Sequence, residues 1–263
     1  MTSVATPHWR SSDGEATAPE GTYVTEIAGC EADVRAAQRL RYEVFANELG
    51  AQIPGAETGL DRDPFDRYCD HLLVRHGPTG DVVGTYRILR YEQAKRAGGF
   101  YSANEFDLRR LTRLGPRVME VGRACVHPAH RGGLVVSQLW AALFDYVRST
   151  GHEYVIGCGS ISVAEYGRQA VSICNRLKKT RLSPTELRVF PYRPFPLSNP
   201  ATADAGSLPP LLKGYLRLGA SVCGDPAWDP RFGTADVLML LPVADIAPRY
   251  ARGLHRRAQR AWG

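Results

Sequence analysis

Several features that would fix a location or a fold class are absent from this sequence. No apolar run reaches the roughly 18 residues that a membrane-spanning helix needs, and residues 1–21 contain no apolar stretch of the kind found in signal peptides. The six cysteines are scattered and form no C-x-x-C pair, so a disulfide framework is not indicated. These absences predict a cytoplasmic protein whose thiols stay reduced.

Lysine is scarce as well. Arginine supplies 29 of the 33 basic residues, and the net charge is +6. This excess of positive charge indicates an acidic partner. Nucleic acid is not favoured, because no binding motif or basic-aromatic pattern accompanies the charge, whereas an anionic membrane surface and an acidic carrier protein both fit.

Metal-ligating residues form only one short cluster. Cys125, His127 and His130 stand close together in the sequence, but no matching second pair accompanies them. The sequence therefore predicts no metal site.

The composition can support a substantial core. With 263 residues, 44% of them hydrophobic, the chain can form one large domain or a domain with an extension. Residues 1–21 are rich in Ser, Thr, Ala, Pro and Gly and predict a disordered tail, followed by a domain over 22–242. Within that domain, the Pro- and Ser-rich segment 183–207 predicts a loop or lid. Residues 243–263 place apolar and arginine side chains on opposite faces of a predicted helix, which would pack on the domain or lie on an anionic membrane.

One apolar run, Val118–Val126, organises the prediction of function, because it carries Glu120 and Arg123 three positions apart. The two side chains would point to opposite faces of a regular strand, unless a bulge at Gly122 adds a residue and turns both one way. A bulge would also free backbone N–H groups beside a carboxylate, an arrangement that suits acyl transfer. The alternative is a plain strand whose Glu and Arg serve unrelated surface pairs.

Other charged residues stand at unusual places. Arg41 lies among the apolar residues of a helix predicted over 31–49, where it either snorkels to solvent or has a functional role. The acidic segment 60–70 could bind the cationic end of a small substrate, or its carboxylates could cap turns. Arg87 lies inside a strand and needs a partner if it is buried, for which those carboxylates or Glu120 are available.

The remaining pattern predicts strands alternating with helices. The strands are expected at 23–28, 71–75, 82–91, 118–126 and 152–158, and the helices at 31–49, 135–150 and 163–179. The loop with Arg131, Gly132 and Gly133 leads from a strand into a helix, and a helix N-terminus offers N–H groups and a positive dipole end to an anion.

This order of elements resembles the GNAT acyltransferase superfamily, and the sequence looks like its long-chain branch, the ornithine Nα-acyltransferases, which make lyso-ornithine lipid from acyl carrier protein thioesters. The stretches that carry the resemblance extend from about residue 38 to about residue 242 and are 41–45, 65–74, 84–87, 99–108, 120–126 and 209–219. The resemblance implies an α/β (α+β) fold, with a mixed, mostly antiparallel central sheet flanked by helices and a C-terminal extension.

The branch is also similar to the acyl-homoserine lactone synthases, and the residues typical of that group have counterparts here. The resemblance implies that Glu120 and Arg123 are catalytic. It implies that a second set shapes the acceptor site, namely Arg41, Phe45, Asp63, Asp66 and Arg87. Glu120 would act as general base in direct transfer, with backbone N–H groups near Gly122 and Ala124 holding the oxyanion. No Ser or Cys lies in a nucleophile-elbow motif that would favour a covalent intermediate.

The resemblance also bears on the donor. Acetyl-CoA enzymes of the superfamily have glycines where Leu134 and Val136 stand here, in the window that begins Arg131-Gly132-Gly133, and side chains there would crowd a diphosphate. This favours the acyl-phosphopantetheine of acyl carrier protein as donor, with no permanently bound cofactor. Ornithine or a similar amino acid is the expected acceptor, and the inner face of the cell membrane a place of peripheral contact. Two alternatives stay open: an acyl-homoserine lactone-type signal synthase that uses S-adenosylmethionine, and a membrane-active, hemolysin-like protein.

Overall fold

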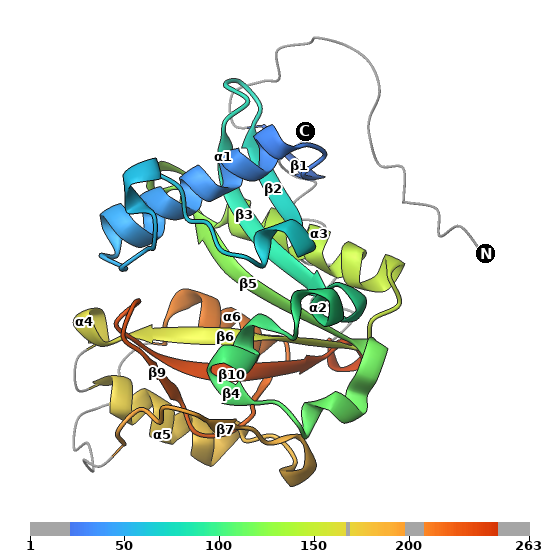
Figure 1. Cartoon of the computed structure of the whole chain (residues 1–263), viewed down its shortest axis with the longest axis vertical. Helices are drawn as coiled ribbons and strands as arrows, with labels where there is room; N and C mark the ends of the chain where they lie inside the picture. The colour runs from blue at the N-terminus through green and yellow to red at the C-terminus, as the bar shows by residue number, and fades with distance from the viewer. Residues whose placement is uncertain (1–21, 167–168, 198–207, 247–263) are drawn as a thin grey trace.

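A computed structural model describes residues 22–166, 169–197 and 208–246, and the statements below concern these residues (Figure 1). The predicted tail 1–21 lies outside them, as do residues 247–263 of the predicted C-terminal helix and residues 198–207 of the predicted lid. No helix in the described part of the chain is long and apolar enough to cross a membrane.

A single large sheet forms the centre of the molecule. Its strands follow the order β1 (Tyr23–Ile27), β2 (Asp70–His76), β3 (Val82–Arg90), β5 (Val118–Val126), β6 (Tyr154–Ser162), β10 (Thr234–Pro242) and β8 (Ser221–Val222), and β9 (Ala227–Asp229) also pairs with β10. Neighbouring strands are antiparallel except β5 and β6, which are parallel. The prediction of a mixed, mostly antiparallel sheet is confirmed. A second, small sheet pairs β4 (Phe106–Asp107) with β7 (Phe190–Pro191).

The sheet divides between β5 and β6. These strands pair only from Val118 to Glu120, whereas β6 pairs with β10 along its whole length. Figure 1 shows β5 and β6 side by side at one end and apart at the other. Gly157 lies where they separate, and a Cβ atom there would collide with the carbonyl oxygen of Val121. Glu120 is thus the last residue of β5 that pairs with β6, and the two strands separate directly after it.

Helices cover both faces. The α-helices in the described part of the chain are α1 (Glu31–Tyr42), α2 (Tyr91–Ala97), α3 (Leu134–Ser149), α4 (Val163–Tyr166), α5 (Gln169–Arg181) and α6 (Pro210–Arg217). A π-helical segment, η1 (Glu43–Glu48), continues α1. Short 3-10 turns are η2 (Ala56–Thr58), η3 (Asp66–Tyr68), η4 (Tyr101–Asn104), η5 (Leu111–Arg117), η6 (Pro128–His130), η7 (Thr185–Leu187) and η8 (Val243–Asp245).

The predicted elements recur with shifted ends. The strand predicted over 152–158 begins at Tyr154 and continues to Ser162, because its pairing with β10 extends that far. The strand predicted to end at Tyr91 ends one residue earlier, where α2 begins. The helix predicted over 163–179 corresponds to α4 and α5, with residues 167–168 between them outside the described part.

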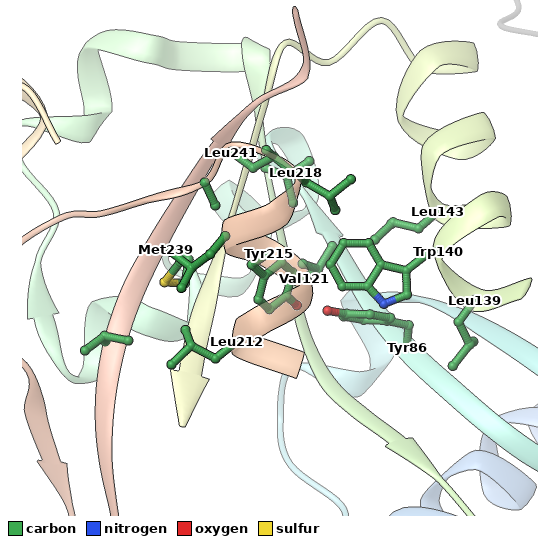
Figure 2. Packing of buried hydrophobic residues seen from close by; sticks show 14 of the residues in the cluster. Tyr86, Val121, Leu139, Trp140, Leu143, Leu212, Tyr215, Leu218, Met239 and Leu241 are labelled. Carbon is green, nitrogen blue, oxygen red and sulfur yellow. The ribbon is translucent and has the colours of Figure 1, made fainter. Parts of the chain in front are cut away.

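The main hydrophobic core lies on the face of the sheet that α3 and α6 cover (Figure 2). Strand alternation gives this face Tyr86 of β3 and Val121 of β5, and gives Arg87 and Glu120 the other face, toward α1. Figure 2 shows the packing of side chains from β3, β5, α3, the α6 region and β10, which are Tyr86, Val121, Leu139, Trp140, Leu143, Leu212, Tyr215, Leu218, Met239 and Leu241. The rings of Trp140 and Tyr215 pack at a tilt of 48°, with centroids 4.9 Å apart. The apolar core therefore begins directly behind the strand that carries Glu120.

Candidate active site

The predicted bulge is present in β5. Thr85 faces Cys125 and Arg87 faces Gly122, so that two steps along β3 match three steps along β5. Arg123 has φ 52°, and it is the one non-glycine residue with a positive φ in the described part of the chain. Such a backbone costs on the order of 1 kcal/mol for a residue with a side chain. The extra residue brings Glu120 and Arg123 to one cavity, as the sequence predicted.

Glu120 is held by backbone N–H groups from the segment before β4. Its side chain is buried, and its Oε1 accepts a hydrogen bond from Ser102 N at 2.8 Å while Oε2 accepts one from Tyr101 N at 2.5 Å. Burial raises the pKa of Glu120 above its ordinary value, although the hydrogen bonds from Ser102 and Tyr101 act in the opposite direction. A raised carboxyl pKa lies closer to neutral pH, which suits a group that must accept a proton.

The charged side chains that the sequence singled out meet in one cluster, the ion-pair network, which consists of Arg41, Arg87, Arg123, Asp61, Asp63 and Asp66. Arg41 has no exposed surface and donates Nε to Asp61 at 2.9 Å and Nη1 to Asp66 at 3.0 Å. The interpretation of Arg41 as a snorkelling side chain is therefore wrong, because its guanidinium ends among carboxylates and not in solvent.

The other two arginines complete this network. Arg87 Nη1 lies 2.6 Å from Asp63 and 3.0 Å from Asp66. Arg123 Nε lies 3.2 Å from Asp61. Although burial alone would raise it, Arg41 and Arg87 hold the pKa of Asp66 well below its usual range. Asp66 is thus held in its ionised form, and all three carboxylates are paired with guanidinium groups within the protein.

Aromatic rings surround Arg123. Its guanidinium carbon lies 4.7 Å from the ring centre of Phe232, 5.1 Å from that of Tyr101 and 6.0 Å from that of Phe45. Tyr101 also accepts a hydrogen bond from Arg123 Nη2 through its hydroxyl oxygen, at 3.2 Å. These contacts fix a guanidinium at the wall of the cavity in a favourable cation–π setting.

The cavity has a volume of about 260 Å³ and lies where β5 and β6 separate. Side chains from both faces of the sheet line it. The apolar end includes Tyr86, Val121, Leu211, Leu212 and Tyr215, and the polar end includes Glu105, Glu120, Cys158, Asp229 and Asp236. The cavity thus joins a surface suited to a hydrocarbon chain to one suited to a cation.

The acidic end of the cavity, formed by Glu105, Cys158 and Asp236, was not predicted from the sequence. Their ligand atoms lie within 4.8 Å of one another. Burial first, and then the nearby Asp236, raise the pKa of Glu105 to about 9, and burial raises the pKa of Asp236 as well. One signal was available: Asp236 interrupts an apolar strand, Thr234–Pro242, where a lone carboxylate is unusual.

Tyr86 is a second residue that the sequence did not single out. Its side chain is 1% exposed, and its hydroxyl has no hydrogen-bond partner in the part of the chain that the structure describes. It lines the cavity from the face of α3 and α6. A buried hydroxyl without a partner is available to a bound ligand.

The predicted anion-binding loop has the expected strand–loop–helix form but lies away from the cavity lining. Arg131 is paired with Glu48 through Nη1 at 2.5 Å and Nη2 at 2.6 Å. Gly133 has φ 87° and precedes Leu134, the first residue of α3. Val136 is 39% exposed at the same helix end.

The predicted site residues therefore separate into three groups. Those that line the cavity are Phe45, Arg87, Glu120, Gly122, Arg123 and Ala124. Those that lie outside the lining within the ion-pair network are Arg41, Asp63 and Asp66. Those of the loop are Arg131, Gly132 and Gly133, and they lie apart from the lining.

The short Cys–His cluster is not assembled into a metal site in the described part of the chain. Cys125 packs with Leu40 of α1. His127 lies 3.2 Å from Glu43, and His130 Nδ1 lies 3.0 Å from the Tyr23 hydroxyl.

The fold is that of the GNAT class. Residues 40–141 match the family model described as "Acetyltransferase (GNAT) domain". The fold is similar to that of the acyl-homoserine lactone synthase BjaI, with TM-score 0.52 and 16% identity over 87% of this chain and 83% of that one. It is also similar to FeeM, an N-acyl amino acid synthase from uncultured soil microbes, with TM-score 0.51 and 13% identity over 84% and 90% of the two chains.

Sequence relatives give the particular family. The chain is 38% identical over 247 residues to an L-ornithine N(alpha)-acyltransferase of Brucella abortus, covering 88% of each protein. It is 40% identical over 244 residues to one of Rhizobium meliloti, covering 86% of this chain and 82% of the relative. The chain belongs to the L-ornithine N(alpha)-acyltransferase family and is an acyltransferase.

Proposed function

We propose that this protein moves a long-chain fatty acyl group from acyl carrier protein to the α-amino group of ornithine, forming a lyso-ornithine-type lipid. The choice of ornithine as acceptor is supported by the activity for which the relatives are named. The observation that carries the proposal is Glu120, a buried carboxylate fixed by two backbone N–H groups at the start of the opening between β5 and β6.

The reaction is a direct transfer with Glu120 as general base. Glu120 takes a proton from the attacking amine, directly or through a water, as the nitrogen forms a bond to the thioester carbonyl carbon. Backbone N–H groups at Gly122–Ala124, where the pairing with β3 is interrupted, stabilise the oxyanion. The carbon–sulfur bond then breaks, and the thiolate leaves readily because a thiol has a pKa of about 8.5.

Arg123 would hold the carboxylate of the acceptor. It lines the cavity beside Phe45, and a guanidinium binds a carboxylate through two parallel hydrogen bonds. Arg41, Asp63 and Asp66 would act as positioning residues, since their charges are already paired with one another and with Arg87.

Acyl carrier protein is the donor that the loop before α3 favours. Leu134 begins that helix, and its side chain and that of Val136 stand where a coenzyme A diphosphate would need glycine. The charge of Arg131 is already neutralised by Glu48, which weakens this loop further as a diphosphate site. The net charge of +6 is complementary to an acidic carrier.

Two further assignments rest on the sequence. Segment 183–207 would act as a loop or lid of the domain 22–242. Residues 243–263 begin with the 3-10 turn η8 and not with the predicted helix. The rest of this segment would form a basic helix that brings the enzyme to the inner face of the membrane, where a poorly soluble product must go.

The test is product mass. Purified protein is mixed with a long-chain acyl carrier protein thioester and L-ornithine, and lipids are extracted and weighed by mass spectrometry. The expected product is one acyl group joined to ornithine with loss of the thiol. A lactone formed instead from S-adenosylmethionine would replace the proposal by a signal synthase. Vesicle leakage without consumption of thioester would replace it by a membrane-active protein.

A further inference from the structure

Two carboxyl groups in the active-site cavity, those of Glu105 and Asp236, form no ion pair with a basic side chain among the described residues. Asp236 of β10 is 5% exposed, and Glu105 has one buried oxygen, Oε2, without a hydrogen-bond partner among the described residues. The hydroxyl of Thr234 donates to Asp236 Oδ1 at 2.7 Å. The other charged groups that raise the pKa of Glu105 are Asp229 and Glu120, which are also acidic. The acidic end of the cavity is therefore a place where positive charge is missing.

The acidic end lies at a suitable distance from the base. Glu120 pairs across the strands with Ile156, and Cys158 follows Ile156 by two residues on the same face of β6. Two residues along a strand span about 6.6 Å. The α- and ω-nitrogens of an extended five-carbon diamino acid are separated by about 6 Å, given ordinary bond lengths of about 1.5 Å. A molecule with its α-amine at Glu120 can thus place its second amine among these carboxyl groups.

We propose that Glu105 and Asp236 receive the side-chain ammonium of an α,ω-diamino acid and so select this class of acceptor over neutral amino acids. The inference rests on the proposed function, because it places the α-amine at Glu120. In the empty cavity the two carboxyl groups share one proton. When the ammonium enters, this proton leaves to solvent and the ammonium donates hydrogen bonds to both carboxylates.

A metal ion is the other occupant that three such groups could hold. The Cys158 thiol argues against it, because burial and then the neighbouring carboxyl groups raise its pKa well above the usual value. Metal ions bind the thiolate and not the thiol. An ammonium needs only acceptors, which Glu105 and Asp236 supply.

The experiment compares L-ornithine with L-norvaline, which has the same carbon chain without the second amine. Acceptor kcat/KM is measured for both with the wild type, Glu105→Gln and Asp236→Asn. Glu186→Gln, at an exposed position in η7, is the matched control. We expect wild type to prefer ornithine. Each cavity variant should lower the ratio of kcat/KM for ornithine to kcat/KM for norvaline by about 10- to 100-fold, the range for losing a hydrogen bond to a charged group.

Failure of this inference can be told from failure of the proposed function. If the wild type acylates no amine, the proposed function is wrong, and the inference is then decided by calorimetric binding of ornithine and norvaline in two buffers of different ionisation heat. Preferential binding of ornithine with proton release, lost in Glu105→Gln, supports it. Equal loss for both acceptors in the variants, an unchanged ornithine preference, or binding of Zn²⁺ in place of ornithine would overturn it.

Discussion

The ion-pair network and the acidic end of the cavity flank Glu120, and they differ in how their buried carboxyl groups are partnered. In the network, three guanidinium groups face three carboxylates at 2.6 to 3.7 Å. At the acidic end, Glu105 and Asp236 meet beside Cys158 and form no ion pair within the part of the chain that the structure describes. The pKa of Asp66 in the network is held well below its usual range, whereas the pKa of Glu105 is raised to about 9.

Apart from Arg87 and Arg123, which belong to the network and also line the cavity, this difference separates groups that position from groups that bind. A paired buried charge already makes its hydrogen bonds within the protein. Removing one partner leaves the other charge buried and unpaired, which lowers the stability of the fold strongly. Carboxyl groups crowded together without a cation gain most when a ligand brings one. The network therefore holds β3, β5 and the loop at 61–66 in place, and the acidic end is where an acceptor has most to contribute.

Glu120, between the two regions, should give the largest effect. Glu120→Gln keeps the shape of the side chain but removes the base, and its single amide oxygen can accept a hydrogen bond from only one of the two N–H groups, Tyr101 or Ser102. We expect turnover to fall by on the order of 100-fold or more, as for loss of a general base. Circular dichroism should match the wild type, and Tm should be lower because one buried N–H group loses its acceptor. Near-normal turnover in a folded variant would exclude Glu120 from the mechanism.

Breaking the network should chiefly affect stability. Arg41→Met removes one of the two guanidinium groups that face each of the buried carboxylates Asp61 and Asp66, and the free energy of unfolding should fall by about 3–5 kcal/mol. Arg35→Ala breaks the exposed pair with Glu31, whose side chains are 53% and 80% exposed, and should cost less than about 1 kcal/mol. Urea unfolding measures both. Equal, small losses would mean that the network does not support the fold.

The two regions should also differ in the pH dependence of stability. Burial, and then Asp236, raise the pKa of Glu105 in the folded protein to about 9. The contribution of Glu105 to the free energy of unfolding is therefore fully present below the pKa of the unfolded chain, 4.5, and is lost as pH rises through the pKa of the folded protein. The Glu105→Gln variant should not lose this stability as pH rises, because a Gln side chain does not titrate. At pH 9 the variant should exceed the wild type by at least about 1 kcal/mol, or roughly 2–4 °C in Tm. At pH 4 the two should agree.

Asp66 gives the opposite sign. Its depressed pKa stabilises the fold above the unfolded value of 3.8, and this contribution is lost as pH falls toward the folded value. Melting curves from pH 3 to pH 9 cover both regions. A Glu105→Gln variant that is less stable than wild type at pH 9 would contradict the description of the acidic end.

The smallest expected effect concerns the donor. The rate with an acyl carrier protein thioester should fall about threefold or more between 50 and 500 mM salt, because the basic surface attracts an acidic carrier. The same acyl group on free pantetheine serves as the control and should show no such dependence. Efficient use of acyl-CoA, with no salt effect on the carrier-bound donor, would overturn the donor assignment.

The sequence predicted the parts of the site that depend on local pattern. The strand Val118–Val126 has the predicted ends, and the bulge at Gly122 lies where a Glu and an Arg needed to face one way. The partners of Arg87 were predicted because a buried guanidinium requires carboxylates, and segment 60–70 supplied them.

The rest depended on contacts that pattern does not reveal. Glu105 and Asp236 are 131 positions apart and meet only because β10 pairs with β6 while the segment before β4 crosses the sheet. Arg41 had apolar neighbours along its helix, so local periodicity could not show that its guanidinium reaches Asp61. The change from α1 to a π-helical turn at Glu43 likewise left no periodic signal.

The most direct test of the central claim is the position of the acyl group on ornithine. Tandem mass spectrometry of the product from purified protein, acyl carrier protein thioester and L-ornithine distinguishes the two nitrogens. If the α-amine lies at Glu120 while Glu105 and Asp236 hold the side-chain ammonium, the acyl group is found on the α-nitrogen alone. Acylation of the side-chain nitrogen, or of both nitrogens, would contradict this orientation of the acceptor.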